Sequence, residues 1–404
     1  MSAEKIVVIG IGYVGLPAAI LLARAGHQVL GVDVDTRRIE EVNSSVLHLG
    51  EKELADILKE PEVKRNLRAA AKPEEGDVFI IAVPSPLDHR KKIADLSYVE
   101  AAAASVLPVL RAGNLVIVES TIPPLTCRDV VTPILERSGL KVGRDILLAH
   151  CPERILPGNV FHEIVHNDRV IGGTTPEASR RARDVYARFV KGGLIITDDV
   201  TAEMVKLLEN TYRDVNIALA NEIAAVGETL GVDPLEMIAL ANRHPRVNLL
   251  KPGIGVGGHC IPLDPWFIKQ VDPANSRLIF AARLINDEQP GRIAAKIRKA
   301  LREVADPRIV AVGATYKANV PDVRESPSAT IVETLRADGY RVEHFDPLVE
   351  GMQYASIQDI ARGADCLAIL VEHDQVRAEL QAEKKKIEAA MKTPLILRFY
   401  ENGA

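Results

Sequence analysis

One cysteine stands inside a glycine-rich stretch, PGIGVGGHCIPLDPWF, which we call the cysteine loop, residues 252–267. Glycines without Cβ atoms let the backbone approach a ligand closely, and Cys260 follows them with Asp264 four residues later. This pattern predicts a rigid loop holding a thiolate nucleophile. Two alternatives stay open: Cys260 packs as a small hydrophobe in a surface turn, and His259 is a packed loop histidine rather than a general base.

A second chemical signature lies near the start of the chain, where a β-branched run meets the glycine motif Gly10–Gly15 (GIGYVG) and then an apolar helix. The next strand, 27–32, ends at Asp33. In this context the glycines allow close approach to a pyrophosphate, and the acid accepts hydrogen bonds from a ribose. An acid there repels a 2′-phosphate, so the motif predicts NAD; Arg37 and Arg38, which suit a phosphate, keep NADP open.

A third set of polar residues recurs on a helix predicted over 201–231. Lys206, Asn210 and Arg213 are spaced so that all three project from one face. A solvated face is the ordinary explanation for such a row, and a face that meets a specific polar ligand is the other. Two arginines and a histidine follow in 243–246, and guanidinium groups suit phosphate or carboxylate recognition.

The elements that must position these residues alternate between strand and helix in the first half of the chain. We expect strands at 77–83, 114–119, 146–150, 169–172 and 194–197, with helices near 97–111, 126–138 and 176–190. This alternation predicts a mostly parallel, doubly wound sheet with ligands at the carboxyl ends of its strands. Polar residues follow three strands, at 83–86, 119–121 and 151–154; each group is either part of one site or a simple polar turn.

The rest of the chain divides into a helical middle and a second winding. After the helix over 201–231 we expect a helix from Pro234 and a long amphipathic helix over 274–302 that is interrupted near Pro290. Strands and helices then alternate again from 308 to 399 without the glycine motif. The sequence thus predicts an α/β fold of two Rossmann-like doubly wound domains, 1–198 and 304–404, joined by a central helical domain, 199–303, with a long spine helix.

Size and composition exclude several classes of protein. A chain of 404 residues needs more than one core, and a net charge of −5 offers no basic field for nucleic acid or lipid. The N-terminus shows no signal peptide, and no apolar stretch is long enough to span a membrane, so we expect a cytoplasmic protein. Its four cysteines are scattered, which predicts reduced thiols, no zinc site and no bound metal.

The chain resembles the UDP-glucose/GDP-mannose dehydrogenase family from end to end. The motifs that carry the resemblance occur in the family's order: GIGYVGLP (Gly10–Pro17), ESTIPPLT (Glu119–Thr126), CPERILPG (Cys151–Gly158), KLLENTYRDVNIALANE (Lys206–Glu222), GVGGHCIPLDP (Gly255–Pro265) and TYKANVPDVRESP (Thr315–Pro327). HNDRVIGG at 166–173, HPRVN at 244–248 and GGHCIPLDPWF at 257–267 are most similar to the branch that acts on UDP-N-acetylmannosamine. Two departures are Leu263, where UDP-glucose enzymes usually carry Lys, and Ser85, where Thr is frequent.

The resemblance implies a four-electron oxidation of a sugar 6-hydroxyl to a uronate for polysaccharide biosynthesis, with two NAD reduced. Lys206 and Asn210, with a water held by Asp264, would polarise or deprotonate the hydroxyl. Cys260 would then attack the aldehyde, giving a thiohemiacetal and, after the second hydride transfer, a thioester. The charge of Lys206 would lower the thiol pKa and stabilise the oxyanion.

Hydrolysis of the thioester would fall to Glu153 or to a water positioned by Thr121. By the same matching, NAD would contact Gly10, Gly12, Tyr13, Val14, Gly15, Asp33, Arg38, Ser85, Thr121 and Arg324. The nucleotide sugar would contact Arg154, Ile155, Lys206, Asn210, Arg213, His244, Arg246, Gly257, Tyr316 and Lys317. The partner implied is a UDP-sugar, and the long helices suggest a homodimer or a higher homo-oligomer.

Two other functions remain open at this point. One is a sister enzyme acting on UDP-N-acetylglucosamine or UDP-glucose, with the same chemistry and a different sugar pocket. The other is a sensor that binds NAD or a nucleotide sugar without catalysis. Retention of Cys260 together with Lys206, Asn210 and Asp264 argues against the sensor, because a binding protein needs no nucleophile.

Overall fold

The computed structural model describes residues 3–47, 52–155 and 160–399. The chain divides into two compact units, Met1–Leu208 and Glu209–Ala404. Among the described residues, no helix combines the length and apolar character that a membrane span requires.

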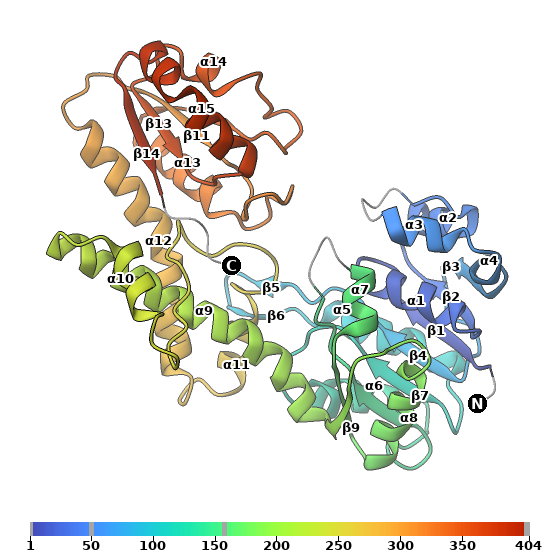
Figure 1. Cartoon of the computed structure of the whole chain (residues 1–404). Helices are drawn as coiled ribbons and strands as arrows, with labels where there is room; N and C mark the ends of the chain where they lie inside the picture. Colours follow the sequence, from blue (N-terminus) through green and yellow to red (C-terminus); the bar gives the residue numbers. More distant parts are fainter. Residues whose placement is uncertain (1–2, 48–51, 156–159, 400–404) are drawn as a thin grey trace. The chain divides into compact units, whose positions relative to one another are not determined.

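Unit 1 is built on an eight-stranded sheet with strand order β10-β9-β8-β7-β4-β1-β2-β3 (Figure 1). Its strands are β1 (Lys5–Ile9), β2 (Gln28–Val32), β3 (Leu67–Ala70), β4 (Val78–Ile81), β7 (Leu115–Val118), β8 (Leu147–His150), β9 (Arg169–Gly173) and β10 (Leu194–Asp198). All neighbours pair in parallel except β8 and β9, which are antiparallel. The predicted mostly parallel, doubly wound sheet is therefore confirmed, while β3 and the short hairpin β5 (Leu87–Asp88) and β6 (Ile93–Ala94) were not predicted.

Helices cover both faces of this sheet, because successive side chains of each strand point to opposite faces and both sets are apolar. Ile6 and Val8 pack into a core with α1, α3, α7 and α8, and Val7 and Ile9 pack into a second core with α5 and α6. The helical segments of unit 1 are α1 (Gly15–Arg24), α2 (Thr36–Ser44), α3 (Lys52–Leu58), α4 (Pro61–Asn66), α5 (Ser97–Ser105), η1 (Leu107–Val109), η2 (Cys127–Val131), α6 (Thr132–Glu136), α7 (Val160–His166) and α8 (Pro176–Tyr186). Burial of both sheet faces is typical of parallel sheets.

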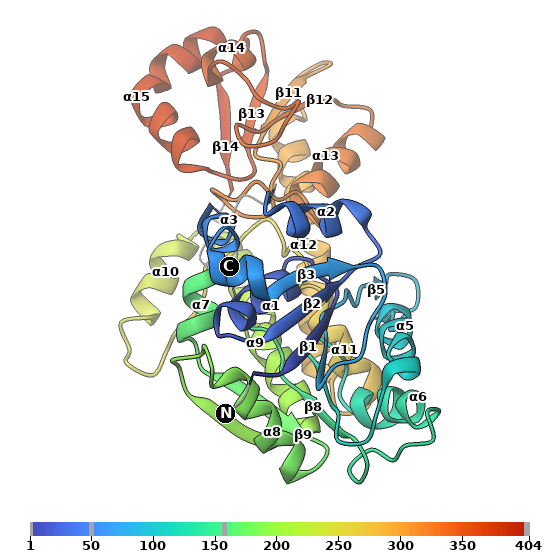
Figure 2. The same cartoon turned by 90° about the vertical axis from the view of Figure 1, so that its right-hand side faces the viewer.

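Unit 2 contains most of the long helix α9 (Asp199–Leu230), which begins in unit 1. The other helices of this unit are α10 (Pro234–Ala241), α11 (Asp264–Val271), α12 (Arg277–Leu301), α13 (Pro327–Ala337), α14 (Ile357–Ala361) and α15 (Asp374–Ala390). A parallel sheet of order β12-β11-β13-β14 is formed by β11 (Arg308–Val312), β12 (Arg341–Phe345), β13 (Cys366–Ile369) and β14 (Leu395–Arg398). One face packs on α12 and α13 and the other on α14 and α15, which Figure 2 shows on opposite sides of the strands.

The expected interruption at Pro290 was wrong, because α12 is continuous and contains this proline in its interior. The turns on either side are held by tertiary contacts: Asn286 accepts a hydrogen bond from Asn221 of α9 at 3.0 Å, and Gln289 donates to the Gly253 carbonyl at 2.9 Å. A Cβ built on Gly255 would lie 3.3 Å from Cδ of Pro290, so the buried proline ring packs against the cysteine loop. Tertiary packing outweighs the local helix-breaking preference here.

Candidate active site

The glycine motif of unit 1 forms a tight turn between β1 and α1. Gly10 has a φ of +89°, and a Cβ on it would lie 2.5 Å from the Ala82 carbonyl oxygen. A Cβ on Gly15 would lie 1.9 Å from the Gly10 carbonyl oxygen. Around Gly12, in contrast, a Cβ would meet nothing within 4 Å. Two glycines are thus required by the turn, and the third leaves open space before the N-terminus of α1, which fits a bound pyrophosphate.

Asp33, at the end of β2, holds the turn in place. Its Oδ2 accepts a hydrogen bond from the Ile11 amide at 3.0 Å, and its Oδ1 accepts one from the Asp35 amide at 2.9 Å. Arg37 pairs with Asp35 at 2.9 Å and Arg38 pairs with Glu41 at 2.9 Å. Both arginines have acidic partners here, and the carboxylate of Asp33 at the end of β2 favours NAD over NADP.

The loops after β4 and β7 are joined by hydrogen bonds. The Val83 amide donates to Ser120 Oγ at 2.9 Å, and Ser120 Oγ donates to the Val83 carbonyl at 2.7 Å. Ser85 Oγ donates to the carbonyl of Thr121. The structure therefore brings two of the three predicted polar strand ends together at the carboxyl edge of the sheet. Tyr13 is 39% exposed beside the glycine turn.

The third strand end, after β8, presents Glu153. This residue is buried, its Oε1 accepts a hydrogen bond from the Arg154 amide at 2.7 Å, and its Oε2 pairs with Nη2 of Arg169 at 2.6 Å. Arg154 Nη1 donates to the Asp168 carbonyl at 3.0 Å, and Ile155 packs against the first core of unit 1. Residues 156–158, the end of the CPERILPG motif, lie outside the described residues.

In unit 2 the polar face of α9 is no solvated surface. Asn210 is fully buried and donates through Nδ2 to Oδ2 of Asp264 at 2.5 Å. Arg213, one turn later, donates to Oδ1 of Asn210. Lys206 precedes Asn210 by one turn of the same helix, in the part of α9 that belongs to unit 1, and is half-buried. The predicted row thus includes a buried amide fixed between a carboxylate and a guanidinium.

Cys260 lies just before the N-terminus of α11. The amides of Leu263 and Asp264 donate to its carbonyl at 3.1 and 2.9 Å. Cys260 is therefore the first residue of a tight turn that leads into the helix. All four cysteines are described and none forms a disulfide, but only Cys260 is exposed. Burial raises the pKa of Cys151 and of Cys366 to about 12. A helix N-terminus stabilises a thiolate, so Cys260 is the cysteine suited to nucleophilic attack.

The cysteine loop packs directly on the segment 315–325 of the same unit. A Cβ on Gly257 would lie 2.7 Å from Cβ of Tyr316 and 2.5 Å from the Glu325 carbonyl oxygen. The Gly258 amide donates to the Arg324 carbonyl at 3.1 Å. The missing Cβ atoms therefore allow two backbone segments to touch, and this brings Tyr316 to the cysteine loop.

Three further predicted residues lie on loops of unit 2. Arg324 pairs with Asp322 through Nη2 at 2.6 Å, and this hydrogen bond is the main reason that the pKa of the guanidinium is raised, with a small contribution from Cys260. His244 is exposed, and its Nδ1 accepts a hydrogen bond from the Arg246 amide at 3.3 Å. Lys317 is half-buried, and its carbonyl accepts from Thr315 Oγ1 at 2.9 Å.

Sequence reasoning missed the groups that shape the 315–319 loop. Asp346, at the end of β12, accepts hydrogen bonds from the Ala314 amide, at 2.6 Å, and from Nε2 of His373, at 3.0 Å. His373 Nδ1 accepts from the Asn319 amide at 2.9 Å. The sequence showed Asp346 at the end of a strand, but it gave no sign of His373, because this histidine lies 27 residues further along the chain.

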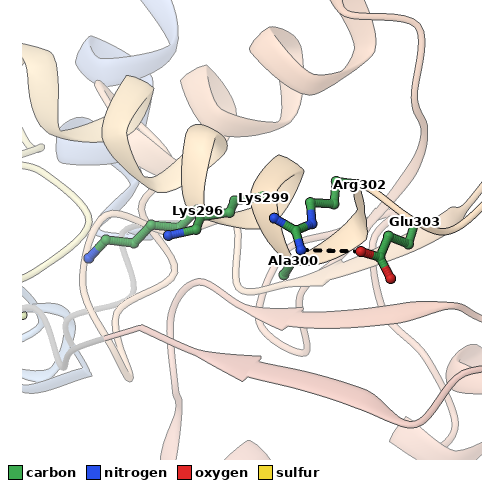
Figure 3. A pocket seen from close by; sticks show the side chains of 5 residues that line it. All are labelled: Lys296, Lys299, Ala300, Arg302 and Glu303. Carbon is green, nitrogen blue, oxygen red and sulfur yellow. Dashed lines mark hydrogen bonds and ion pairs between the residues drawn. The ribbon is translucent and has the colours of Figure 1, made fainter. Parts of the chain in front are cut away.

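A shallow depression of about 530 Å³ lies on the last turns of α12, and none of the predicted site residues lines it (Figure 3). Two of the cations that line it have acidic partners: Lys296 pairs with Glu228 at 2.5 Å and Arg302 with Glu303 at 3.1 Å. The described residues also contain no cluster of three or more His, Cys, Asp or Glu placed to hold a metal ion.

A doubly wound α/β sheet with a glycine turn between its first strand and first helix defines a class, the proteins that bind a dinucleotide at the carboxyl edge of a parallel sheet. Profiles of the UDP-glucose/GDP-mannose dehydrogenase family match residues 4–190 (NAD binding domain), 200–288 (central domain) and 310–400 (UDP binding domain). The chain belongs to this family, and its cofactor is NAD.

Individual relatives agree with the profiles. The chain is 44% identical to a UDP-N-acetyl-D-mannosamine dehydrogenase of Methanocaldococcus jannaschii, with 98% of this chain and 91% of the relative aligned. It is 42% identical to an NDP-N-acetyl-D-galactosaminuronic acid dehydrogenase of Ralstonia nicotianae, over 93% and 92% of the two chains. The solved UDP-D-ManNAc dehydrogenase of Pyrococcus horikoshii superposes with a TM-score of 0.91 at 39% identity, covering 99% of this chain and 96% of that one.

Proposed function

We propose that the chain oxidises the 6-hydroxyl of UDP-N-acetylmannosamine to the carboxylate, using NAD. The observation that carries the proposal is the hydrogen bond between the buried side chains of Asn210 and Asp264. Asp264 follows the exposed Cys260 by four residues. This arrangement offers an oxyanion donor, a carboxylate and a nucleophile. The names of the relatives, at 44% identity and at a TM-score of 0.91, supply the sugar.

The first step makes the aldehyde. Lys206 and Asn210 bind the sugar 6-oxygen, and a water held by Asp264 takes the hydroxyl proton. NAD, when bound by the glycine turn, Asp33, Tyr13, Val14, Arg38, Ser85 and Thr121, supplies a hydride acceptor for each of the two oxidations. Asn210 is fixed at both ends of its amide, so it is ready to stabilise charge on the oxygen without rearrangement.

The second step retains the aldehyde on the protein. The Cys260 thiolate adds to the aldehyde carbon, a C–S bond forms, and the resulting oxyanion is protonated to the thiohemiacetal. Loss of the hydrogen on that carbon as hydride, to the second NAD, together with loss of the hydroxyl proton leaves a thioester. Water then attacks the acyl carbon, and Glu153 takes a proton from that water while Thr121 helps to position it.

The nucleotide sugar itself is assigned to cationic and aromatic side chains. Arg213, Arg246 and His244 are proposed to bind it from the helical domain, 199–303, and Tyr316 and Lys317 from the UDP-sugar domain, 304–404. Arg154 and Ile155 are proposed to contact it from the NAD domain, 1–198, and Gly257 to let it approach the cysteine loop. Arg324 is assigned to NAD, but its guanidinium pairs with Asp322 and also interacts electrostatically with Cys260. We therefore propose a role near Cys260 for this residue as well.

Sister substrates form the second candidate. The relative from Ralstonia nicotianae is named for a different N-acetylated sugar, at 42% identity, and Leu263 in the cysteine loop is buried rather than cationic. We therefore expect the chain to discriminate between N-acetylated sugars and UDP-glucose more strongly than between N-acetylated epimers. UDP-N-acetylglucosamine and UDP-glucose are the substrates to compare.

We also infer that the chain forms a homodimer through α9 and its neighbours. Tyr212, Leu219, Val226 and Leu230 repeat along one stripe of α9 and are 53%, 43%, 49% and 69% exposed. A row of exposed apolar side chains along one face of a helix is typical of an association surface.

A substrate panel tests the proposed function. Purified protein is mixed with excess NAD and limiting UDP-N-acetylmannosamine, UDP-N-acetylglucosamine or UDP-glucose, and NADH is counted per sugar consumed. We expect two NADH per UDP-N-acetylmannosamine and a higher kcat/KM for this sugar than for the other two. One NADH per sugar would contradict the thioester scheme, and NAD binding without turnover of any sugar would favour the sensor.

A further inference from the structure

A buried cluster in unit 1 contains an arginine to which the mechanism above assigns no role. Arg169 begins β9, the strand that pairs antiparallel to β8 with His150 opposite Gly172. The antiparallel direction places the start of β9 at the carboxyl edge of β8, and extending the register puts Glu153 opposite Arg169. A parallel β9 would have placed this arginine at the opposite edge of the sheet.

The contacts of Arg169 are specific. Its side chain is 4% exposed, Nη2 lies 2.6 Å from Oε2 of Glu153, and Nη1 lies 3.5 Å from Oε1 of Glu119 and 3.6 Å from Sγ of Cys151. The guanidinium lies over the ring of Tyr186 at 4.7 Å, and the Tyr186 hydroxyl donates to Glu119 at 2.7 Å. Stacking and two carboxylates therefore fix the plane of the guanidinium.

The two carboxylates differ in what they can do. Burial raises the pKa of Glu119 to about 7, so near neutral pH much of it is protonated and Arg169 serves mainly as the partner of Glu153. Both Glu153 oxygens accept a hydrogen bond, one from Arg169 and one from the Arg154 amide. A carboxylate oxygen has a second lone pair, so each remains able to accept a proton from water in a fixed direction.

We propose that Arg169 is a positioning residue that holds Glu153 in the orientation needed to activate the water of thioester hydrolysis. The inference rests on the proposed function, because it requires a Cys260 thioester. In this step Glu153 takes one proton from water as the new C–O bond forms, and the tetrahedral intermediate collapses with cleavage of the C–S bond. The sulfur leaves as thiolate, and the product acid ionises to the uronate.

The test separates hydride transfer from hydrolysis in Arg169→Lys and Arg169→Met. Rapid mixing with NAD and UDP-N-acetylmannosamine is followed by NADH absorbance, and acid-quenched protein is weighed by intact mass spectrometry. We expect a rapid burst of NADH in both variants, then a steady rate about 10²-fold lower in Arg169→Met, since a positioned base contributes on this order. Acyl-enzyme should accumulate, and Arg169→Lys, which keeps a charge and one donor, should recover part of the rate.

Arg181→Met is the matched control, because Arg181 also pairs with an acid in unit 1, Glu4, but touches none of the cluster. It should show the wild-type burst and no accumulated acyl-enzyme. If Arg169→Met fails to fold, Arg169→Lys is compared alone and in a Glu153→Gln background. A hydrolysis rate that falls no further in the double variant supports the proposal.

Three results would overturn the proposal. In the first, the hydrolysis rate of the double variant falls by the product of the two single losses. In the second, the amplitude of the NADH burst falls by the same factor as the steady rate. In the third, the variant is slow but accumulates no acyl-enzyme. The first would show that Arg169 and Glu153 act independently, and the second would assign Arg169 to folding of the unit. Wild-type protein that forms neither NADH nor acyl-enzyme with any of the three UDP-sugars would instead show that the proposed function itself is wrong.

Discussion

Cys260 differs from the other cysteines in both exposure and surroundings. Cys127, Cys151 and Cys366 are buried in the cores of their units, where burial raises the pKa of each thiol. Cys260 is exposed at the start of α11. Chemical modification at low reagent concentration should therefore label Cys260 alone, which gives a direct assay of this residue.

Cys260→Ala removes the nucleophile without disturbing a buried core. We expect it to bind UDP-N-acetylmannosamine within a few-fold of wild type while uronate formation falls by at least about 10³-fold, since covalent catalysis depends on this one atom. Calorimetry gives the binding constant and chromatography gives the product. Uronate formation by the variant at the wild-type rate would exclude the thioester.

Glu119 gives unit 1 a pH-dependent stability. Its folded pKa of about 7 is raised from 4.5 by burial, so its contribution is complete below pH 4.5 and is lost as pH rises through 7. The loss is on the order of 3 kcal/mol. Glu119→Gln is permanently neutral and can still accept from Tyr186, so urea unfolding should show a smaller fall in unfolding free energy from pH 5 to pH 8. Glu74→Gln, at an exposed site, should keep the wild-type slope.

Among the elements, the cysteine loop depends on what packs around it. Asn221 of α9 accepts from the Gly253 amide at 2.8 Å, and Gln289 of α12 donates to the Gly253 carbonyl at 2.9 Å. Two helices thus hold both backbone groups of one residue near the start of the loop. Gly257 then lies against the segment 315–325, so the loop that presents Cys260 is fixed from several sides.

Gly257→Ala tests this packing. The new methyl group would lie 2.5 Å from the Glu325 carbonyl oxygen, and both are backbone-linked atoms that cannot move aside cheaply. We expect kcat to fall at least about 10-fold and thermal stability to fall, as overpacking costs about 1–3 kcal/mol. Gly291→Ala is the control: its Cβ would meet nothing within 4 Å on α12, so it should raise stability by about 0.5–1 kcal/mol and leave kcat unchanged.

Local patterns in the sequence were enough to predict the alternating strands, the glycine turn and the α9 row, because each depends on residues a few positions apart. Arg169 and His373 were not predicted as parts of these clusters, because their partners are far away in the chain. The sequence predicted β9 as a strand but not its antiparallel direction, which decides where Arg169 lies. Pro290 was misjudged for the same reason: distant side chains keep α12 continuous.

On the scale of the whole chain, the same construction occurs twice. At the end of β2, Asp33 accepts hydrogen bonds from the amides of Ile11 and Asp35. At the end of β12, Asp346 accepts from the amides of Ala314 and Leu348 in the same pattern. The acid in each winding therefore anchors the loop after the first strand. Only the loop after β1 keeps the three-glycine turn, whereas the loop after β11 carries Tyr316 and Lys317. This difference suits the two loops to two different anionic ligands.

The proposed homodimer belongs to the scale of the whole molecule, and the apolar stripe of α9 makes it testable. Leu219→Glu combined with Val226→Glu places two charges on a stripe whose side chains are 43% and 49% exposed, so the fold of unit 2 should persist. In a symmetric dimer formed through this stripe the same charges would be desolvated twice and would repel their copies. Light scattering at micromolar concentration should give a dimer mass for wild type and a monomer mass for the double variant. Leu348→Glu, on an exposed site outside α9, should remain dimeric. A monomeric wild type, or a double variant that keeps the dimer mass, would assign this stripe no role in association.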